Sequence, residues 1–299
     1  MRFLSLEIQQ IFNLQMNKLF FLILISVNIY GYEAFMSAKD LKTVLYDKAL
    51  VIIDVSRSYK KSHIIGAQSL NVDTLTNKEH NNQLIDKNDL EDIFRDLGIN
   101  SSSNVVIYGR NTQKDLKNSA FLAYVLISNG FENVSILDGG YMSWVFKYDL
   151  FTTIKKQDTD EGTITLKNKN LSVGYGSVKN DKNRLIIDTR YPQNYYGIAQ
   201  KKANKYLGHI PKAKNSYYDY KFLRDKRIRS KKELNEFYLD GLNISDAKEI
   251  VIYGDDPKEA AVEWYIIYKH LGYKNAKIYY NSFKEYVELG LKTERFKWE

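Results

Sequence analysis

The sequence IVIYG at residues 250–254 is a short run of apolar, largely β-branched residues that ends in a glycine. The sequence VVIYG at residues 105–109 nearly repeats it in the first half of the chain. Apolar runs of this length are typical of strands buried on both faces, as in parallel sheets. We therefore predict two equivalent buried strands, one in each half.

The segments before these strands recur in the same order, which indicates a duplicated domain. Residues 50–55 (LVIIDV) and 62–67 (SHIIGA) precede the first strand. Residues 185–189 (LIIDT) and 208–213 (GHIPKA) precede the second. The LVIIDV and LIIDT runs predict two further buried strands.

The segments after the strands recur as well. We expect helices at residues 119–128 and 259–270, each followed by a glycine that stops it. Short strands at 134–137 and 276–279 then lead into a turn and a closing helix. Alternating strands and helices predict an α/β fold in which each half is a mainly parallel sheet flanked by helices.

We place the first domain at residues 34–150 and the second at 171–299. The stretch between them, 151–170, is polar, and we interpret it as a linker. The second half carries extra residues at 195–206, which we expect to form a surface loop.

Composition excludes several classes of function. The chain has 44 Lys+Arg against 36 Asp+Glu, a formal charge of +8, and its basic and acidic residues are interleaved. Because no block of like charge is present, we expect no nucleic-acid partner, although the basic excess favours anionic ligands. Cysteine is absent, which excludes disulfides, thiolate metal sites and any cysteine nucleophile.

The beginning of the chain predicts export. LFFLILISV at residues 19–27 follows a lysine and is shorter than the roughly 20 apolar residues of a membrane-spanning helix. We interpret residues 1–31 as a signal peptide, with Met16 as an alternative start. The mature protein is expected to be periplasmic or secreted, without a stable transmembrane span after cleavage; retention of the segment as an anchor is the alternative.

Several of these motifs resemble one known family. The Asp188-Thr189-Arg190 triplet and GHIPKA are similar to the D-x-R and G-H-I-P-G-A motifs of rhodaneses, and residues 134–144 (VSILDGGYMSW) are close to the family's strand, double glycine and tryptophan. The arrangement looks like tandem rhodanese-like domains of the thiosulfate or mercaptopyruvate sulfurtransferase type. The resemblance implies a cysteine after the VVIY strand that accepts and passes on a sulfane sulfur.

Glycine stands at that position in both halves. The family's cysteine falls on Gly254 in the second half and on Gly109 in the first, where the inactive family copy commonly lacks it. Glycine offers no nucleophile. We therefore predict no catalytic residue, no cofactor and no sulfur transfer through a protein persulfide.

The residues after Gly254 predict a further loss. Asp256-Pro257-Lys258-Glu259 has the pattern of a capping box, with Asp256 as N-cap accepting from the Glu259 amide and Glu259 returning to the Asp256 amide. Such a cap uses the amide donors that would hold a substrate anion, and Asp255 adds negative charge. We interpret residues 255–259, that is Asp255, Asp256, Pro257, Lys258 and Glu259, as a vestigial active-site loop.

Other candidate residues have structural explanations. Arg190 and His209 match family positions and are our candidates for anion binding, but His209 and His63 each lie in a turn that a histidine commonly stabilises by bonding the backbone. Asp54 and Asp188, at strand ends, would tie down the turns that follow. Ser119 lacks the surroundings of a nucleophile, and we expect it to start a helix.

The remaining histidines and the tyrosines add no site. The four histidines (His63, His80, His209 and His270) have no metal-ligand spacing, so we predict no metal site. Clustered tyrosines (Tyr217, Tyr218, Tyr220, Tyr279 and Tyr280) can mark a recognition surface, but core packing explains most of them.

Two functions follow as hypotheses. The first is an exported rhodanese-like protein that is inactive in sulfur transfer and has a binding or scaffold role toward an unknown protein partner or a small anion. The alternative is a cysteine-independent enzyme that acts on a small oxyanion in the cleft of the second domain, using Arg190 and His209.

Overall fold

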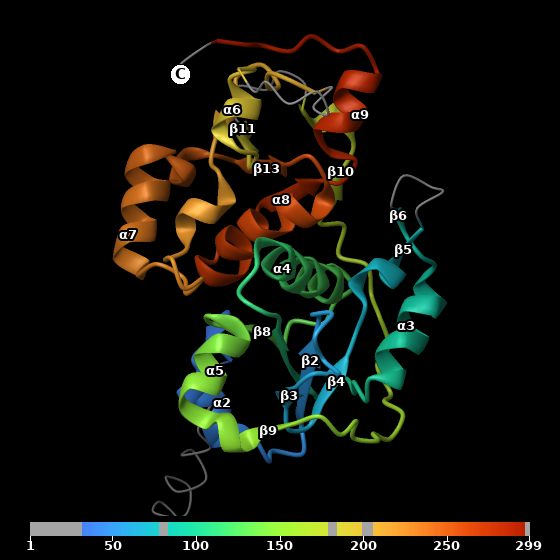
Figure 1. Cartoon of the computed structure of the whole chain (residues 1–299). Coiled ribbons are helices and arrows are strands. Elements are labelled where there is room, and N and C mark those ends of the chain that lie inside the picture. The colour runs from blue at the N-terminus through green and yellow to red at the C-terminus, as the bar shows by residue number, and fades with distance from the viewer. Residues whose placement is uncertain (1–31, 78–82, 179–183, 199–205, 297–299) are drawn as a thin grey trace, which may run out of the picture. The chain divides into compact units, whose positions relative to one another are not determined.

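We analysed a computed structural model, which describes residues 32–77, 83–178, 184–198 and 206–296. The predicted signal peptide, His80 and residues 199–205 of the predicted loop lie outside the described residues. The described residues from Ala34 onward belong to one unit. Figure 1 shows their helices and strands.

Two parallel sheets form as the alternating pattern predicts, each with five strands among the described residues. The N-terminal sheet has the order β1-β8-β7-β2-β4, and the C-terminal sheet has the equivalent order β10-β14-β13-β11-β12. The N-terminal strands are β1 (Phe35–Met36), β2 (Leu50–Asp54), β4 (Ala67–Ser69), β7 (Asn104–Tyr108) and β8 (Val134–Leu137). The C-terminal strands are β10 (Ser172–Val173), β11 (Arg184–Asp188), β12 (Lys214–Asn215), β13 (Glu249–Tyr253) and β14 (Ala276–Tyr279).

Registers at the sheet centres confirm the duplication. Asp54 at the end of β2 pairs with Tyr108 at the end of β7. Asp188 and Tyr253 pair in the same way at the ends of β11 and β13. The two predicted glycine positions therefore follow equivalent strand ends. Antiparallel pairs β3 (His63–Ile64) with β9 (Thr152–Thr153), and β5 (Thr76–Asn77) with β6 (Gln83–Leu84), lie outside the main sheets.

Helices flank both sheets (Figure 1). The α-helices are α2 (Ala38–Val44), α3 (Lys87–Asp96), α4 (Gln113–Ser128), α5 (Gly140–Tyr148), α6 (Pro192–Tyr195), α7 (Lys231–Asn235), α8 (Pro257–Trp264) and α9 (Ser282–Glu288). Short 3-10 segments are η1 (Val72–Leu75), η2 (Asp149–Phe151), η3 (Tyr175–Val178), η4 (Tyr218–Lys221) and η6 (Ile244–Asp246), and π-helical turns are η5 (Glu236–Gly241) and η7 (Tyr265–His270). No helix in the described part of the chain has both the length and the apolarity needed to cross a membrane.

Helix α4 begins earlier than predicted. Its first residue is Gln113, and Thr112 caps it by accepting from the Asp115 amide at 3.1 Å. Ser119 therefore lies inside the helix, where its hydroxyl donates to the carbonyl of Asp115 at 2.9 Å. The prediction of a helix start at Ser119 was wrong. The first turn of the helix is polar, so the apolar pattern begins only after the helix has started.

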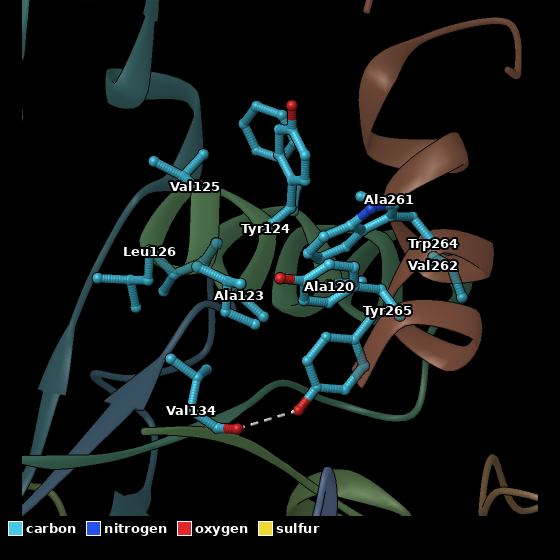
Figure 2. Packing of buried hydrophobic residues seen from close by; sticks show 14 of the residues in the cluster. Ala120, Ala123, Tyr124, Val125, Leu126, Val134, Ala261, Val262, Trp264 and Tyr265 are labelled. Atoms are coloured by element: carbon cyan, nitrogen blue, oxygen red, sulfur yellow. Dashed lines mark hydrogen bonds between the residues drawn. The ribbon is translucent and has the colours of Figure 1, made fainter. Parts of the chain in front are cut away.

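The two halves share one hydrophobic core. Helices α4 and α8 pack against each other, and residues of both belong to a single buried cluster (Figure 2). The rings of Tyr124 on α4 and Trp264 on α8 meet edge to face with centroids 5.0 Å apart. Tyr265 crosses between the halves, donating from its hydroxyl to the carbonyl of Ala34 at 2.6 Å. It also lies 3.3 Å from the carbonyl oxygen of Val134, as the dashed line in Figure 2 marks.

The predicted linker packs closely on the N-terminal half. Ile164 and Leu166 are each 1% exposed and belong to the shared core. The Ile164 amide donates to the carbonyl of Ile99 at 3.1 Å, and the Leu166 amide donates to the carboxylate of Glu91 at 2.9 Å. This segment thus lies as an extended strap that contributes to the core, in addition to joining the halves.

The predicted surface loop begins with a core residue. Tyr195 ends helix α6 and is 2% exposed. Its hydroxyl donates to the carbonyl of Ala213 at 2.6 Å. The prediction of a surface position for Tyr195 was wrong, because a tyrosine can bury its ring while its hydroxyl bonds the backbone.

Candidate functional site

Aspartates at the strand ends organise the turns that follow them. The carboxylate of Asp54 accepts from the Ser56 amide at 2.7 Å, and that of Asp188 accepts from the Arg190 amide at 2.9 Å. Both aspartates are fully buried, and burial raises the pKa of Asp54 above its ordinary value. The predicted role in fixing the turns is confirmed.

A tyrosine and a histidine stack beside each of these strand ends. In the N-terminal half the rings of Tyr59 and His63 lie parallel with centroids 3.7 Å apart. The Tyr59 hydroxyl donates to the carbonyl of Ala67 at 2.8 Å, and Nδ1 of His63 lies 2.9 Å from the carbonyl oxygen of Tyr59. His63 is completely buried by these contacts.

The C-terminal half repeats the arrangement. The rings of Tyr195 and His209 stack at 3.8 Å, and Nδ1 of His209 lies 3.0 Å from the carbonyl oxygen of Tyr195. Nε2 of His209 lies 3.9 Å from a carboxylate oxygen of Glu294. Because His209 is buried and shares its contacts with His63, these contacts support the structural interpretation of both histidines.

The loop after Gly254 is a capped helix start. Asp256 is the N-cap of α8 and Pro257 its first residue, and the Asp256 carboxylate accepts from the Glu259 amide at 2.9 Å. The carboxylate of Glu259 accepts from the Asp255 amide at 2.9 Å. The prediction that Glu259 returns to the Asp256 amide was wrong by one residue, because the extended backbone at the N-cap brings the preceding amide nearer.

Glu259 also occupies the space in which a side chain at residue 254 would lie. A Cβ atom built on Gly254 would be 2.9 Å from both the Cβ of Glu259 and the hydroxyl oxygen of Thr189. Ordinary Cβ contacts are longer than 3.0 Å. The carboxyl group of Glu259 thus fills the space of a side chain at residue 254 and occupies the Asp255 amide.

The N-terminal half contains the same substitution by a carboxylate. A Cβ atom built on Gly109 would lie 2.4 Å from the Cβ of Asp115, which is the third residue of α4. The Asp115 carboxylate accepts from the Arg110 amide at 3.0 Å. In both halves, therefore, the third residue of the helix places a carboxylate on the amide that follows the glycine.

Arg190 is enclosed by its own domain. Its guanidinium is fully buried, with Nη2 2.6 Å from the Asp188 carboxylate and 2.5 Å from the carbonyl oxygen of Gly208. It lies over the ring of Phe283 at 3.7 Å. The carboxylate of Asp255 approaches Nη1 to 3.6 Å. These contacts direct the donors of Arg190 to protein groups, which argues against the anion-binding role considered for it.

An arginine from a different sequence position occupies the equivalent place in the N-terminal half. Ser56 aligns with Arg190, whereas Arg110 aligns with Asp255. The guanidinium of Arg110 donates to the carbonyl of Ser62, which is the equivalent of Gly208, and lies 3.5 Å over the ring of Tyr141. In the C-terminal half the arginine follows the strand-end aspartate, and in the N-terminal half it follows the glycine instead. Both arginines still bond an equivalent backbone carbonyl and lie over an equivalent aromatic ring.

The electrostatics of the C-terminal loop follow from crowded carboxyl groups. Burial and the neighbouring charge of Asp255 raise the pKa of Glu259 to about 8. A proton on Glu259 relieves this repulsion without removing the acceptor that holds the Asp255 amide. Asp255 and Asp256 still place negative charge at the N-terminus of α8.

Sequence comparison agrees with the fold and the strand-end geometry. The sequence model of the rhodanese-like domain matches residues 37–147 and again residues 176–289, so the chain belongs to the rhodanese-like domain family. A Haloferax volcanii protein whose name assigns it to the thiosulfate sulfurtransferases is 27% identical over 251 residues, covering 80% of this chain and 86% of that protein. A sulfur carrier protein of Thermus thermophilus is 25% identical over 275 residues, covering 86% of this chain and 94% of that protein.

Solved structures share the fold. The anaerobic ergothioneine biosynthesis enzyme from Chlorobium limicola, determined with trimethyl histidine, superposes with a TM-score of 0.75 at 18% identity. The match covers 89% of this chain and 71% of that enzyme. Together with the repeated family match, this likeness confirms the predicted tandem α/β fold. The absence of cysteine is consistent with an absent catalytic cysteine.

The remaining predicted residues are dispersed. Tyr218, Tyr279 and Tyr280 are buried, as core packing predicted, whereas Tyr220 is 52% exposed. Among the residues that the structure describes, no group of three or more histidine, aspartate or glutamate side chains is arranged to hold a metal ion. Sequence reasoning missed Asp115, although its position three residues after Thr112 is the usual spacing of a capping pair.

Proposed function

We propose that this chain is an exported rhodanese-like protein that does not transfer sulfur and instead acts through binding. The observation that carries the proposal is the pair of carboxylates, Asp115 and Glu259, that fill the positions beside Gly109 and Gly254. Sulfur transfer through a protein persulfide needs a cysteine thiolate, and cysteine is absent from the sequence. An anionic donor would also meet the negative charge of the C-terminal loop.

The contacts of Arg190 bear on the alternative hypothesis of a cysteine-independent enzyme in the second domain. Such an enzyme would need donors directed at an oxyanion. The guanidinium of Arg190 is instead directed at Asp188 and at backbone carbonyls. This arrangement argues against oxyanion catalysis by Arg190.

A sulfurtransferase assay with thiosulfate and cyanide tests the proposal. We expect no turnover above the blank for the purified wild-type chain and for Gly254→Cys. The double variant Gly254→Cys/Glu259→Ala removes the carboxylate that crowds residue 254, and we expect it to react faster with a thiol reagent than Gly254→Cys does. Turnover by the wild-type chain that Gly254→Trp abolishes would overturn the proposal.

Export requires a separate experiment. Cell fractionation of a C-terminally tagged chain should place the protein outside the cytoplasm, with the mass expected after loss of the first 31 residues. A tagged chain that stays in the cytoplasm at full mass would contradict the export part of the proposal.

A further inference from the structure

A cavity of about 660 Å³ lies at the carboxyl ends of strands β2 and β4 in the N-terminal half. Its wall includes Ser56 and Arg57 after β2, Leu70 and Asn71 after β4, and Asn118 of helix α4. Ligand pockets commonly have volumes of about 300–1,000 Å³. In open parallel sheets, ligands bind outside the carboxyl ends of the strands. This cavity therefore has both the size and the place of a ligand site.

The wall of the cavity is rich in cations. Arg57, Lys60, Lys114 and Lys156 line it, and none of the four forms an ion pair with another described residue. A second cavity, of about 440 Å³, shares Lys114 and adds Lys117. Adjacent unpaired cations raise the local positive potential and attract anions.

The acids in the wall do not cancel this charge. Asp73 forms an ion pair with Lys258, which extends from helix α8 of the other half. The carboxylate of Asp115 accepts from the Arg110 amide. Among the acids of the wall, Asp96 is the one without such a contact within the described residues. Among the described residues, four cations without ion pairs thus face two carboxylates without ion pairs, Asp96 and Asp115, so the wall keeps an excess of positive charge.

Asn118 supplies an independent indication of a ligand. It is 7% exposed and lines both cavities, and its side-chain amide makes no hydrogen bond to another described residue. The amide atoms of Asn118 are not sealed from solvent, so they are accessible to a ligand or water in the cavity. A carboxamide can both donate and accept, which suits a hydroxyl or a heterocycle.

We propose that this cavity binds a phosphate or sulfate monoester of a small polar organic molecule. The charged ester group, a dianion for a phosphate and a monoanion for a sulfate, would lie among the lining cations, where the fork of Arg57 suits tetrahedral oxyanions. The organic part would contact Asn118 and apolar wall residues such as Leu70, because the cavity is larger than an inorganic ion requires. This inference deepens the proposed binding role and rests on it.

Isothermal titration of the purified full chain tests the site. The probes are adenosine 5′-monophosphate, glucose 6-sulfate, inorganic phosphate and uncharged adenosine. We expect at least one monoester to bind at least tenfold more tightly than inorganic phosphate or adenosine do, and its affinity to fall as salt increases. Absence of monoester binding, or equal affinity for inorganic phosphate, would overturn the proposal.

Variants locate the binding. Lys60→Ala and Lys114→Ala should each weaken monoester binding by about tenfold, the size of one lost charged contact. Lys232→Ala, whose side chain is 87% exposed on α7, is the matched control and should bind like the wild type. Asn118→Leu tests the organic part, with circular dichroism to verify its fold. If both cavity lysine variants bind the monoester as tightly as Lys232→Ala does, the monoester does not bind in this cavity.

The two proposals fail separately. Sulfur transfer by the wild-type chain would overturn the proposed inactivity and leave the cavity unaffected. If the wild-type chain neither binds a monoester under any buffer condition nor transfers sulfur, the cavity proposal is overturned and the proposed inactivity stands.

Discussion

Glu259 lies where a side chain on Gly254 would have to go, since a Cβ atom at residue 254 would be 2.9 Å from the Cβ of Glu259. Asp115 has the same relationship to Gly109, at 2.4 Å. Each glycine is therefore matched to a carboxylate on the first turn of the following helix. Restoring a side chain at either glycine requires the carboxylate to move.

Gly254→Ala is expected to destabilise the protein. Overpacking a filled position typically costs about 1–3 kcal/mol, and neither Thr189 nor the Cβ of Glu259 can move far. The free energy of unfolding from urea titration measures the loss. The double variant Gly254→Ala/Glu259→Ala should recover part of it, because it removes the side-chain atoms beyond the Cβ of Glu259.

Gly176→Ala is the matched control, since a Cβ atom there has no neighbour within 4 Å. It should change the unfolding free energy by less than about 0.5 kcal/mol. Equal stability of Gly254→Ala and Gly176→Ala would show that the position beside Glu259 is open.

The raised pKa of Glu259 predicts a pH dependence. The folded chain keeps the proton up to about pH 8, whereas the unfolded chain loses it near its ordinary value of 4.5. Between these values the folded state binds more protons, so this group's contribution to stability falls as pH rises. Glu259→Gln should remove that contribution and unfold at higher urea than the wild type at pH 9.

Measurements at pH 5 and pH 9 separate this effect from general charge effects. The difference between Glu259→Gln and the wild type should be larger at pH 9. Glu236→Gln, with a side chain 61% exposed, serves as the control and should show nearly the same difference at both values. A Glu259→Gln difference that is independent of pH would contradict the pKa shift.

The strap between the halves should be part of the folding unit. Ile164→Ala removes a side chain that is 1% exposed, and such a change typically costs about 2–5 kcal/mol. Thr165→Ala, at the exposed neighbouring position, should be close to neutral. Thermal and urea unfolding of the two variants compare them, and equal stabilities would mean that residues 164–166 are a passive linker.

Lys221 and Glu263 form a buried ion pair with Nζ and Oε2 3.4 Å apart. The Lys221 side chain is 1% exposed and that of Glu263 is 0% exposed. Glu263→Ala leaves the ammonium without its counter-charge and should destabilise the protein by about 3–5 kcal/mol. Lys221→Met/Glu263→Leu should cost much less, because it removes both charges. The free energy of unfolding from urea titration compares the two variants. If Lys221→Met/Glu263→Leu is less stable than Glu263→Ala, the buried pair contributes net stability.

Much of the fold was predictable from the order of its motifs. The IVIYG and VVIYG runs became β13 and β7, each in the middle of its sheet. The N-cap role of Asp256 was also predictable, because a cap is a contact between residues three positions apart. Such local hydrogen bonds need no knowledge of the rest of the chain.

Weak local signals concealed the core packing of the linker and the true start of helix α4. Residues 162–166 (GTITL) alternate between buried and exposed positions, and this period of two was present in the sequence but too short to be noticed against the polar residues around it. The first turn of α4 is polar, so its apolar periodicity begins only after the helix has started.

The sequence by itself determined the duplicated α/β fold, the absence of a cysteine nucleophile and the cap on α8, because each depends on residue identity or on neighbours a few positions apart. Only the tertiary structure decided that Glu259 and Asp115 fill the space beside the glycines, that Arg110 takes the place of Arg190, and that a cationic cavity forms in the N-terminal half. The carboxylates lie close to their glycines in sequence, but whether they fold back over them depends on the three-dimensional course of the loop. The contacts of Arg110 and the cavity depend on how elements distant in the chain pack together, and no pattern within one segment encodes that packing.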